Sequence, residues 1–237
     1  MSKGVLGVGC SFTWGEGLYF YSDLENLPFK ENHEFIPSEI TAAMRSYKDK
    51  HRYIQLVSDE LNTWCHTNNG NGGSNWMSNM FLQDILDESQ KCSVRGTNRY
   101  DDTLKLENYK VTDFDLLIYQ FTNPQRNYHK YDGFEDAVIQ TDKILRKFED
   151  NGVKVLTISW DWEIPINSDN YKELFKHRHV DITYNGTTHP YFHFLTHDDN
   201  YNLSIRSDFY KQGLQKNDEH LNKRGHFVIK ENIMNNL

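Results

Sequence analysis

Residues 114–122, FDLLIYQFT, carry the strongest strand signal in the chain. An almost continuous apolar run of this length is typical of a strand that is buried on both faces of a parallel sheet. Three further short apolar runs indicate neighbouring strands, at residues 3–9 (KGVLGVG), 63–67 (TWCHT) and 153–160 (VKVLTISW). We therefore expect these segments to lie together in one parallel sheet.

The intervals between these strands show the spacing of helices. Apolar side chains recur every three to four residues in four stretches, at 53–61, from Ser74 onward, at 134–150 and at 222–234. Gly152 stands where the third helix should end, because glycine is favoured just beyond a helix C-terminus. Residues 20–50 are polar and are expected to be loop-like. Strands that alternate with helices predict an α/β fold with helices on both faces of the sheet.

The size and charge of the chain limit the classes of function. It has 237 residues, with 26 Lys and Arg against 34 Asp and Glu, which gives a formal net charge of −8 at pH 7. A chain of this length can bury a substantial core, and we expect a single domain over residues 1–237. The acidic balance argues against nucleic-acid binding, which needs a basic surface. No apolar run approaches the ~18 residues that a membrane span requires.

The compartment is inferred from the first ten residues and from the cysteines. Residues 1–10 contain one lysine and too short an apolar stretch for a signal peptide. Three cysteines without a Cys-x-x-Cys motif indicate neither a disulfide framework nor a zinc ribbon. These features predict a cytoplasmic protein, and the Asn-heavy composition adds the hypothesis that it is carried on a viral particle.

Residues 161–217 fit the alternation of strands and helices worst, so we expect an irregular insertion there. The insertion contains five of the eleven histidines: His177, His179, His189, His193 and His197. The last three are four residues apart and in a helix would share a face that could bind zinc. Four aromatic residues instead favour a wall over the site that stacks on sugar rings: Trp160, Trp162, Tyr191 and Phe192.

Polar residues and glycines follow the predicted strands, where ligands bind in open parallel sheets. Ser11 follows the first strand, an Asn/Gly cluster that ends in Gly73 follows the second, and Asn123 follows the third. Asp218 and His220 precede the last helix. These residues supply what acyl transfer needs. Ser11 is the candidate nucleophile, His220 its base and Asp218 the carboxylate that orients the base. The backbone N–H groups of Ser11 and Gly73 and the side-chain amide of Asn123 are candidate donors to the oxyanion.

These segments resemble the sequence blocks of the SGNH, or GDSL-type, hydrolase family. Residues 9–15, GCSFTWG, match the block Gly-Asp-Ser-x-Thr-x-Gly except that Cys10 replaces the aspartate, and residues 68–73, NNGNGG, match Asn-x-Gly-x-x-Gly. His220 followed by Gly225-His226 keeps the spacing of the last block, although Asp218 lies two residues before the histidine rather than three. The third block is degraded. Its asparagine aligns with Asn123 or, if the alignment is shifted by one residue, with Thr122.

The resemblance implies a three-layer α/β/α sandwich, flavodoxin-like, around a parallel sheet of about five strands. It also implies an esterase or acyl hydrolase without a cofactor or a metal. We interpret the chain as a serine esterase acting on a small-molecule or polysaccharide ester, with O-acetyl groups on a carbohydrate as the favoured substrate. The alternatives are a binding or structural protein that has lost catalysis on the same fold, and a metal-assisted hydrolase that uses the insertion histidines.

Several candidate residues also have simpler interpretations. Ser11, Ser74 and Asp218 are residue types that cap helices, and Asn123 before Pro124 is typical of a turn. A backbone carbonyl could then orient His220 in place of Asp218. Cys10 is expected to be a buried packing residue, because its side chain should point away from that of Ser11.

Overall fold

The computed structural model describes residues 3–15, 17–18, 21, 42–67, 73–88, 109–126, 130–211, 213 and 218–237. Four parallel strands form the main sheet, namely β1 (Gly4–Val8), β2 (Cys65–Thr67), β3 (Phe114–Phe121) and β4 (Lys154–Ser159). They lie in the order β2-β1-β3-β4, and every neighbouring pair is parallel. This is the order of the first four strands of a flavodoxin-like sheet. The predicted α/β class is confirmed.

The outer edge of β4 carries a single bridged residue where a fifth strand would lie. His179 forms an isolated parallel bridge to Thr157 of β4. The Thr157 N–H donates to the Arg178 carbonyl, and the Val180 N–H donates to the Thr157 carbonyl, both at 2.8 Å. Pairing stops there, so the main sheet has four strands in the described part of the chain, against the five expected.

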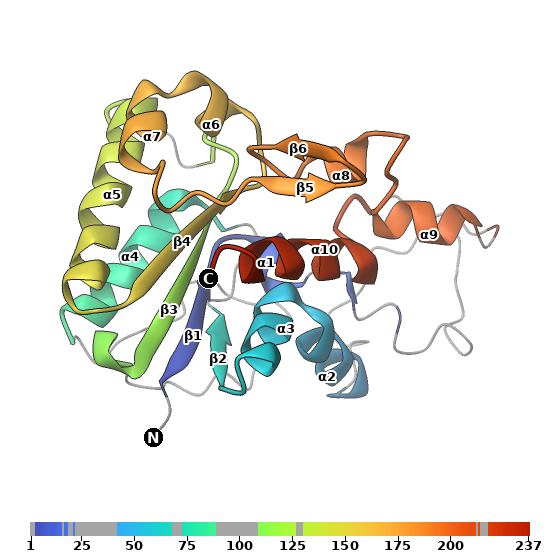
Figure 1. Ribbon diagram of the computed structural model, residues 1–237, viewed down its shortest axis with the longest axis horizontal. Coiled ribbons are helices and arrows are strands. Elements are labelled where there is room, and N and C mark those ends of the chain that lie inside the picture. The colour runs from blue at the N-terminus through green and yellow to red at the C-terminus, as the bar shows by residue number, and fades with distance from the viewer. Residues whose placement is uncertain are drawn as a thin grey trace.

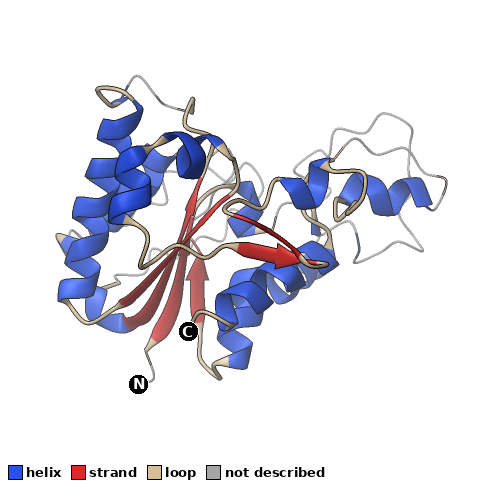
Figure 2. Ribbon diagram, turned by 45° about the horizontal axis from the view of Figure 1, so that its top comes forward, coloured by secondary structure: helices blue, strands red, loops and turns tan. Residues whose placement is uncertain are grey.

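Helices cover both faces of this sheet and complete three layers (Figures 1 and 2). Helices α4 (Asn75–Leu86) and α5 (Phe134–Asp150) pack on one face, and α3 (Tyr53–Glu60) and α10 (Lys223–Met234) pack on the other. Alternate residues of β3 serve the two faces, because successive side chains of a strand point in opposite directions. Ile118 therefore lies in the core with Ile54 and Ile229, and Tyr119 lies in the core with Phe148 and Leu145.

The longest predicted elements match the structure closely. Helix α5 has the predicted bounds, and Gly152 follows it with φ +82°. Ser74 caps α4 by accepting from the Met77 N–H at 3.3 Å. Asn222 caps α10 in the same way by accepting from the Gly225 N–H at 2.9 Å.

Part of the stretch expected to be loop-like, and the insertion, differ from the sequence-based expectation. Residues 42–51 form α2 (Ala42–His51), and the 3-10 helix η3 (Val111–Asp113) precedes β3. The insertion is regular rather than irregular and contains α6 (Glu163–Asn167), α7 (Asp169–Leu174), β5 (Ile182–Tyr184), β6 (Thr187–His189), α8 (Phe194–His197) and α9 (Ile205–Lys211). Each of the insertion's elements is three to seven residues long, which is too short for a periodic pattern to stand out in the sequence. Residues 22–41, which the loop prediction also covered, lie outside the described residues.

None of the described helices is both long enough and apolar enough to cross a bilayer.

Candidate active site

Ser11 lies at the point where β1 ends and the short helix α1 (Ser11–Trp14) begins. It is the first residue of α1 and is 7% exposed, so the residue is almost entirely enclosed. The carboxyl ends of the parallel strands meet at this edge of the sheet, as expected for a binding site in this fold.

Three candidate residues form one hydrogen-bonded row. His220 Nε2 lies 2.8 Å from Ser11 Oγ, and His220 Nδ1 lies 2.7 Å from Asp218 Oδ1. A carboxylate only accepts, so the neutral imidazole carries its proton on Nδ1 and leaves Nε2 free to accept from the Ser11 hydroxyl. The side chains of His220 and Asp218 are 26% and 12% exposed. Water is thus largely kept from the carboxylate while the imidazole stays within reach of a substrate.

The segment that carries His220 is held by the last part of the insertion. The Ile205 N–H donates to the His220 carbonyl at 2.9 Å, and the Arg206 N–H donates to the Asp218 carbonyl at 2.8 Å. Leu221 forms an antiparallel bridge to Ser204. The insertion therefore fixes the backbone on both sides of the base, a role that the sequence did not reveal because it depends on pairing between distant residues.

Phe12 supports the imidazole from the side of the nucleophile. Its ring lies 4.8 Å from that of His220 and 5.3 Å from that of Trp160, centroid to centroid. The residue after the nucleophile thus packs on the base, and Trp160 extends the stack away from it. The sequence analysis did not identify Phe12 as a site residue, although its position directly after Ser11 could have indicated this.

Gly17 lies close to the other end of the row. It has φ +81°, and a Cβ added there would lie 3.1 Å from Asp218 Oδ2 and even closer to Ile205. Glycine adopts this backbone conformation at no steric cost. A side chain at position 17 would therefore press on the carboxylate that contacts His220.

Cys10 has the buried position that was expected of it. It is 1% exposed and lies in the core on the α3 side of the sheet. Burial raises the pKa of its thiol, so the sulfur stays protonated rather than forming the reactive thiolate. Its neighbour Ser11, and not Cys10, contacts the imidazole.

The second sequence block is described only at its last residue. Gly73 is buried, and its carbonyl accepts from Arg126 Nη1 at 3.2 Å. Arg126 follows β3, so this contact joins the loops after β2 and β3 at the same edge of the sheet as Ser11. Residues 68–72 lie outside the described residues.

Asn123 makes contacts at both ends of its amide. Its Oδ1 accepts from the Gln125 N–H at 2.9 Å, as in an Asn-initiated turn, and its Nδ2 donates to Asp161 Oδ2 at 3.0 Å. The turn interpretation is therefore correct, yet the second proton of Nδ2 stays available to another acceptor. Asp161 is a further residue that the sequence analysis missed, and it orients the amide.

The alternative placement of the third block, on Thr122, has a different environment. Asn75 Oδ1 accepts from the Thr122 N–H at 2.9 Å, and Asn75 Nδ2 donates to the Thr122 carbonyl at 3.3 Å. Thr122 is fully buried. Asn75 therefore does more than continue the helix after Ser74, since its amide fixes the backbone immediately before Asn123.

The three insertion histidines that are four residues apart do not all share one helix face. His189 ends β6, whereas His193 precedes α8 and His197 ends it. The rings of His193 and His197 stack 3.6 Å apart, and the ring of His189 lies 4.4 Å from that of Phe194. Burial lowers the pKa of His193, and the charge of His197 lowers it further. Within the described ranges no three His, Cys, Asp or Glu side chains are grouped so that they could hold a metal ion.

The four aromatic residues proposed for sugar stacking fall into two groups. Phe192 is fully buried and packs edge-on against Phe12, so it belongs to the core and not to a binding wall. Trp160 and Tyr191 are partly buried and pack against the same core. Trp162, two residues beyond Trp160, is 45% exposed and is the member with the largest open surface.

Comparison with known proteins finds similarity in structure and not in sequence. No family model matches the chain, and no curated protein matches it. Two solved structures of a family two carbohydrate esterase from Clostridium thermocellum, an active-site mutant and a complex with cellohexaose, superpose with a TM-score of 0.48 at 9% and 10% identity. They cover 98% of this chain, which spans only 62% of the length of theirs.

Proposed function

We propose that the protein is a serine hydrolase of the SGNH type that cleaves esters, with O-acetylated carbohydrate as its substrate class. One observation carries the proposal: Ser11, His220 and Asp218 form a continuous row with contacts of 2.8 and 2.7 Å. A serine hydroxyl is a weak nucleophile on its own and becomes a strong one when a positioned base removes its proton during attack.

The proposed reaction proceeds by acylation and deacylation. Ser11 Oγ attacks the acyl carbon while its proton passes to His220 Nε2, and the acyl oxygen becomes an oxyanion. The tetrahedral intermediate then collapses, the C–O bond to the alcohol breaks, and the alcohol takes the proton from Nε2. Water attacks the acyl-serine in the same way, with Nε2 as the base, and releases the acid and free Ser11. Asp218 stabilises the imidazolium that forms in both halves.

The oxyanion would be held by donors at the same edge of the sheet. The backbone N–H groups of Ser11 and Gly73 and the second Nδ2 proton of Asn123 are the candidates. Loss of one such donor typically costs about 2.7–4 kcal/mol of transition-state stabilisation. The contact between Asn123 and Asp161 supports this role, since it fixes the amide before substrate binds.

The test of mechanism is labelling with a fluorophosphonate probe. We expect wild type to be labelled, and Ser11→Ala and His220→Ala to lose the label. Ser78→Ala, which removes a buried serine from α4, is the matched control and should label like wild type. A folded wild type that takes no label would contradict the proposal and favour a binding protein on this fold.

The test of substrate class compares two esters. Deacetylation of an acetylated sugar and hydrolysis of p-nitrophenyl acetate should both require Ser11. Trp162→Ala should raise KM for the sugar ester while leaving the hydrolysis of p-nitrophenyl acetate unchanged, because the exposed indole would stack on a sugar ring and has no role in the chemistry. If Trp162→Ala has the wild-type KM for the sugar ester as well, Trp162 is not part of the binding site.

A further inference from the structure

A buried row of polar side chains lies directly behind the turn that carries Ser11. Cys10, Thr13, Tyr53 and Gln120 are each at most 1% exposed. They come from both sides of Ser11, from α3 and from the carboxyl end of β3. Burial of polar groups is costly unless every one is hydrogen-bonded. The proposed acylation and deacylation steps do not use these side chains.

Gln120 contacts the turn on both sides of the nucleophile. Its Nε2 donates to Cys10 Sγ at 2.9 Å, and its Oε1 accepts from Thr13 Oγ1 at 2.5 Å. Cys10 immediately precedes Ser11, and Thr13 lies within the same helical turn as Ser11. One amide on the rigid central strand thus fixes the two ends of the segment that contains the nucleophile.

Tyr53 completes the row from the neighbouring helix. Its hydroxyl lies 2.8 Å from Thr13 Oγ1 and 3.3 Å from Gln120 Oε1. The Thr13 hydroxyl has one proton, which it gives to Gln120, so it must accept the proton of Tyr53. Burial raises the pKa of Tyr53, which keeps this hydroxyl a donor.

The row extends to the helix that follows the base. The Tyr53 N–H donates to His226 Nδ1 at 3.3 Å, and the two rings stack with centroids 5.7 Å apart. His226 lies in the first turn of α10, just after the segment that carries His220. There is no spare room at the start of the row, since a Cβ at Gly9 would lie 2.7 Å from that of Gln120 and closer still to the Thr13 hydroxyl.

We infer that Gln120, Thr13 and Tyr53 are positioning residues, which hold the Ser11 turn at hydrogen-bonding distance from His220. The inference rests on the proposed hydrolase function for its kinetic consequence. Its geometric content is independent of that function: loss of the row should let Ser11 move away from Nε2. A displacement of about 1 Å at a reacting atom can lower a rate by about a hundredfold.

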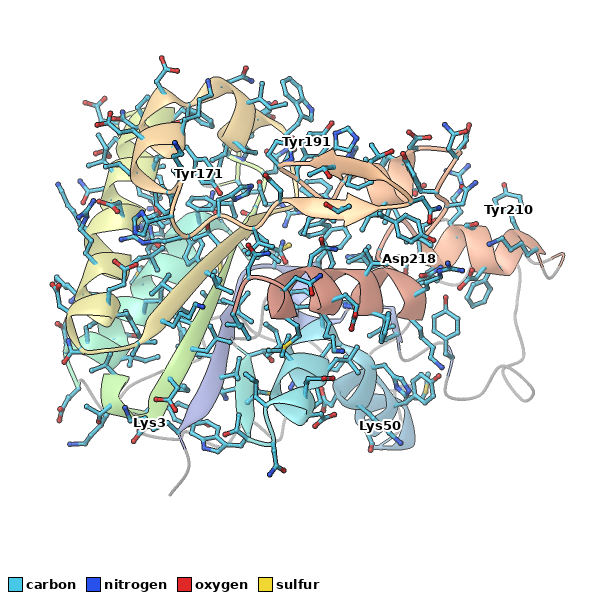
Figure 3. All side chains as sticks on the ribbon, viewed as in Figure 1. Lys3, Lys50, Tyr171, Tyr191, Tyr210 and Asp218 are labelled. Carbon is cyan, nitrogen blue, oxygen red and sulfur yellow. The ribbon has the colours of Figure 1, made fainter. Side chains whose placement is uncertain are left out.

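The chain offers a matched pair of buried hydroxyls for the test. Thr157 and Tyr171 are also buried, and their hydroxyls lie 3.4 Å apart. Tyr171 belongs to the core on the other face of the sheet, far from Asp218 (Figure 3). Thr13→Val and Tyr53→Phe therefore remove hydroxyls beside Ser11, whereas Thr157→Val and Tyr171→Phe remove comparable hydroxyls elsewhere.

The kinetic readout is fluorophosphonate labelling of Ser11 under single-turnover conditions. Thr13→Val and Tyr53→Phe should lower the maximal first-order labelling rate by about tenfold or more, and leave the probe concentration that gives half of it unchanged. Thr13→Ser, which keeps the hydroxyl, should restore the rate to near that of wild type. The two control variants should label at the wild-type rate even where they melt at a lower temperature.

The structural readout does not depend on activity. Crystal structures of Thr13→Val and Tyr53→Phe should show Ser11 Oγ moved out of contact with His220 Nε2, and the control variants should keep the contact. If the contact and the labelling rate persist in both test variants, the inference is wrong. If wild type takes no label, the proposed function fails, and the position of Ser11 in the variant crystals still decides the inference.

Discussion

Asp218 makes two contacts with His220 through one oxygen. Its Oδ1 lies 2.7 Å from Nδ1 and also accepts from the His220 backbone N–H at 3.0 Å. An asparagine here could present its NH₂ to Nδ1, which would place the imidazole proton on Nε2. A protonated Nε2 cannot accept the proton of the Ser11 hydroxyl. We therefore expect Asp218→Asn to lower the labelling rate by about 10²–10⁴-fold with little loss of stability.

The control for this variant lies next to it in the sequence. Glu219 pairs with Arg206 at 2.6 Å and makes no described contact with His220. Glu219→Gln should therefore label within about twofold of wild type. If Asp218→Asn labels as fast as Glu219→Gln, a group other than Asp218 orients the base.

His226 makes the stability of the protein sensitive to acid. Burial lowers its pKa from 6.5 to about 3, and the charges of His220 and Arg52 act in the same direction. Between these two pH values the unfolded chain binds a proton at this residue and the folded chain does not, so stability is lost as the pH falls. The free energy of unfolding should therefore fall by up to about 1.4 kcal/mol per pH unit below 6.5 on account of His226.

His226→Gln tests this dependence because its Oε1 can still accept from the Tyr53 N–H. Urea unfolding at pH 7, 5.5 and 4.5 should give a smaller decrease in the free energy of unfolding for the variant than for wild type. His177→Gln, which removes an imidazole with a 60% exposed side chain, should keep the wild-type dependence. The explanation fails if His226→Gln and wild type lose the same free energy of unfolding over this range.

At the scale of elements, Asn75, the first residue of α4, holds the loop that follows β3. Asn75→Ala would leave the buried Thr122 N–H and carbonyl without their partner, and an unsatisfied buried group costs about 1–3 kcal/mol. We expect a loss of that size in the free energy of unfolding. The labelling rate should also fall, since Asn123 follows directly on the released backbone.

The same helix supplies the control for Asn75→Ala. Asn79 is also buried, and its Nδ2 donates to Tyr131 at 2.9 Å and to Thr141 at 2.8 Å, away from Thr122. Asn79→Ala should destabilise the protein to a similar degree while the folded protein labels at the wild-type rate. Equal labelling by the two variants would separate Asn75 from the site.

The elements that the sequence predicted well are the ones with long local patterns. Helix α5 repeats its apolar face over 17 residues and β3 is apolar almost throughout, so both were predicted nearly to their bounds. Helix α2 was missed because a stretch rich in charge gives little periodic signal. The short elements of the insertion give little periodic signal, although β5 and β6 pair across the two-residue turn Asn185-Gly186, a local hairpin signal that the sequence analysis did not use.

The residues of the site divide in the same way, into those with a local sequence signal and those without one. Ser11, His220 and Asp218 stand in recognisable local blocks, and the structure brings them together. Gln120, Asp161 and Asn75 act through partners 38 to 110 positions away. Nothing in their own neighbourhood distinguishes them from ordinary polar residues, so the sequence alone did not identify them.

At the scale of the whole molecule, two of the places where the insertion is attached lie far apart along its sequence. Near its end, residues 203–206 hold the segment of His220, as described above. Near its start, Arg178 is 1% exposed and forms contacts of 2.6 Å with both Asp142 and Glu149 of α5. Its carbonyl also accepts from β4. The second attachment lies on the α5 side of the sheet, on the opposite side from the core that contains Phe12 (Figure 1).

This separation predicts that Arg178 stabilises the fold without influencing the chemistry. Loss of one partner from a buried ion pair typically costs about 3–5 kcal/mol. The loss of unfolding free energy in Arg178→Met should lie at the lower end of this range, because Arg146 still contacts the other Asp142 oxygen at 2.7 Å.

Arg146 is the matched control. It binds the same carboxylate but its side chain is 53% exposed, so Arg146→Met should cost at most about 1 kcal/mol. Urea unfolding measures both losses, and fluorophosphonate labelling at low temperature, where Arg178→Met is still folded, should give the wild-type rate. Slow labelling of folded Arg178→Met would instead show that the two attachments of the insertion are coupled, and that the position of His220 depends on α5.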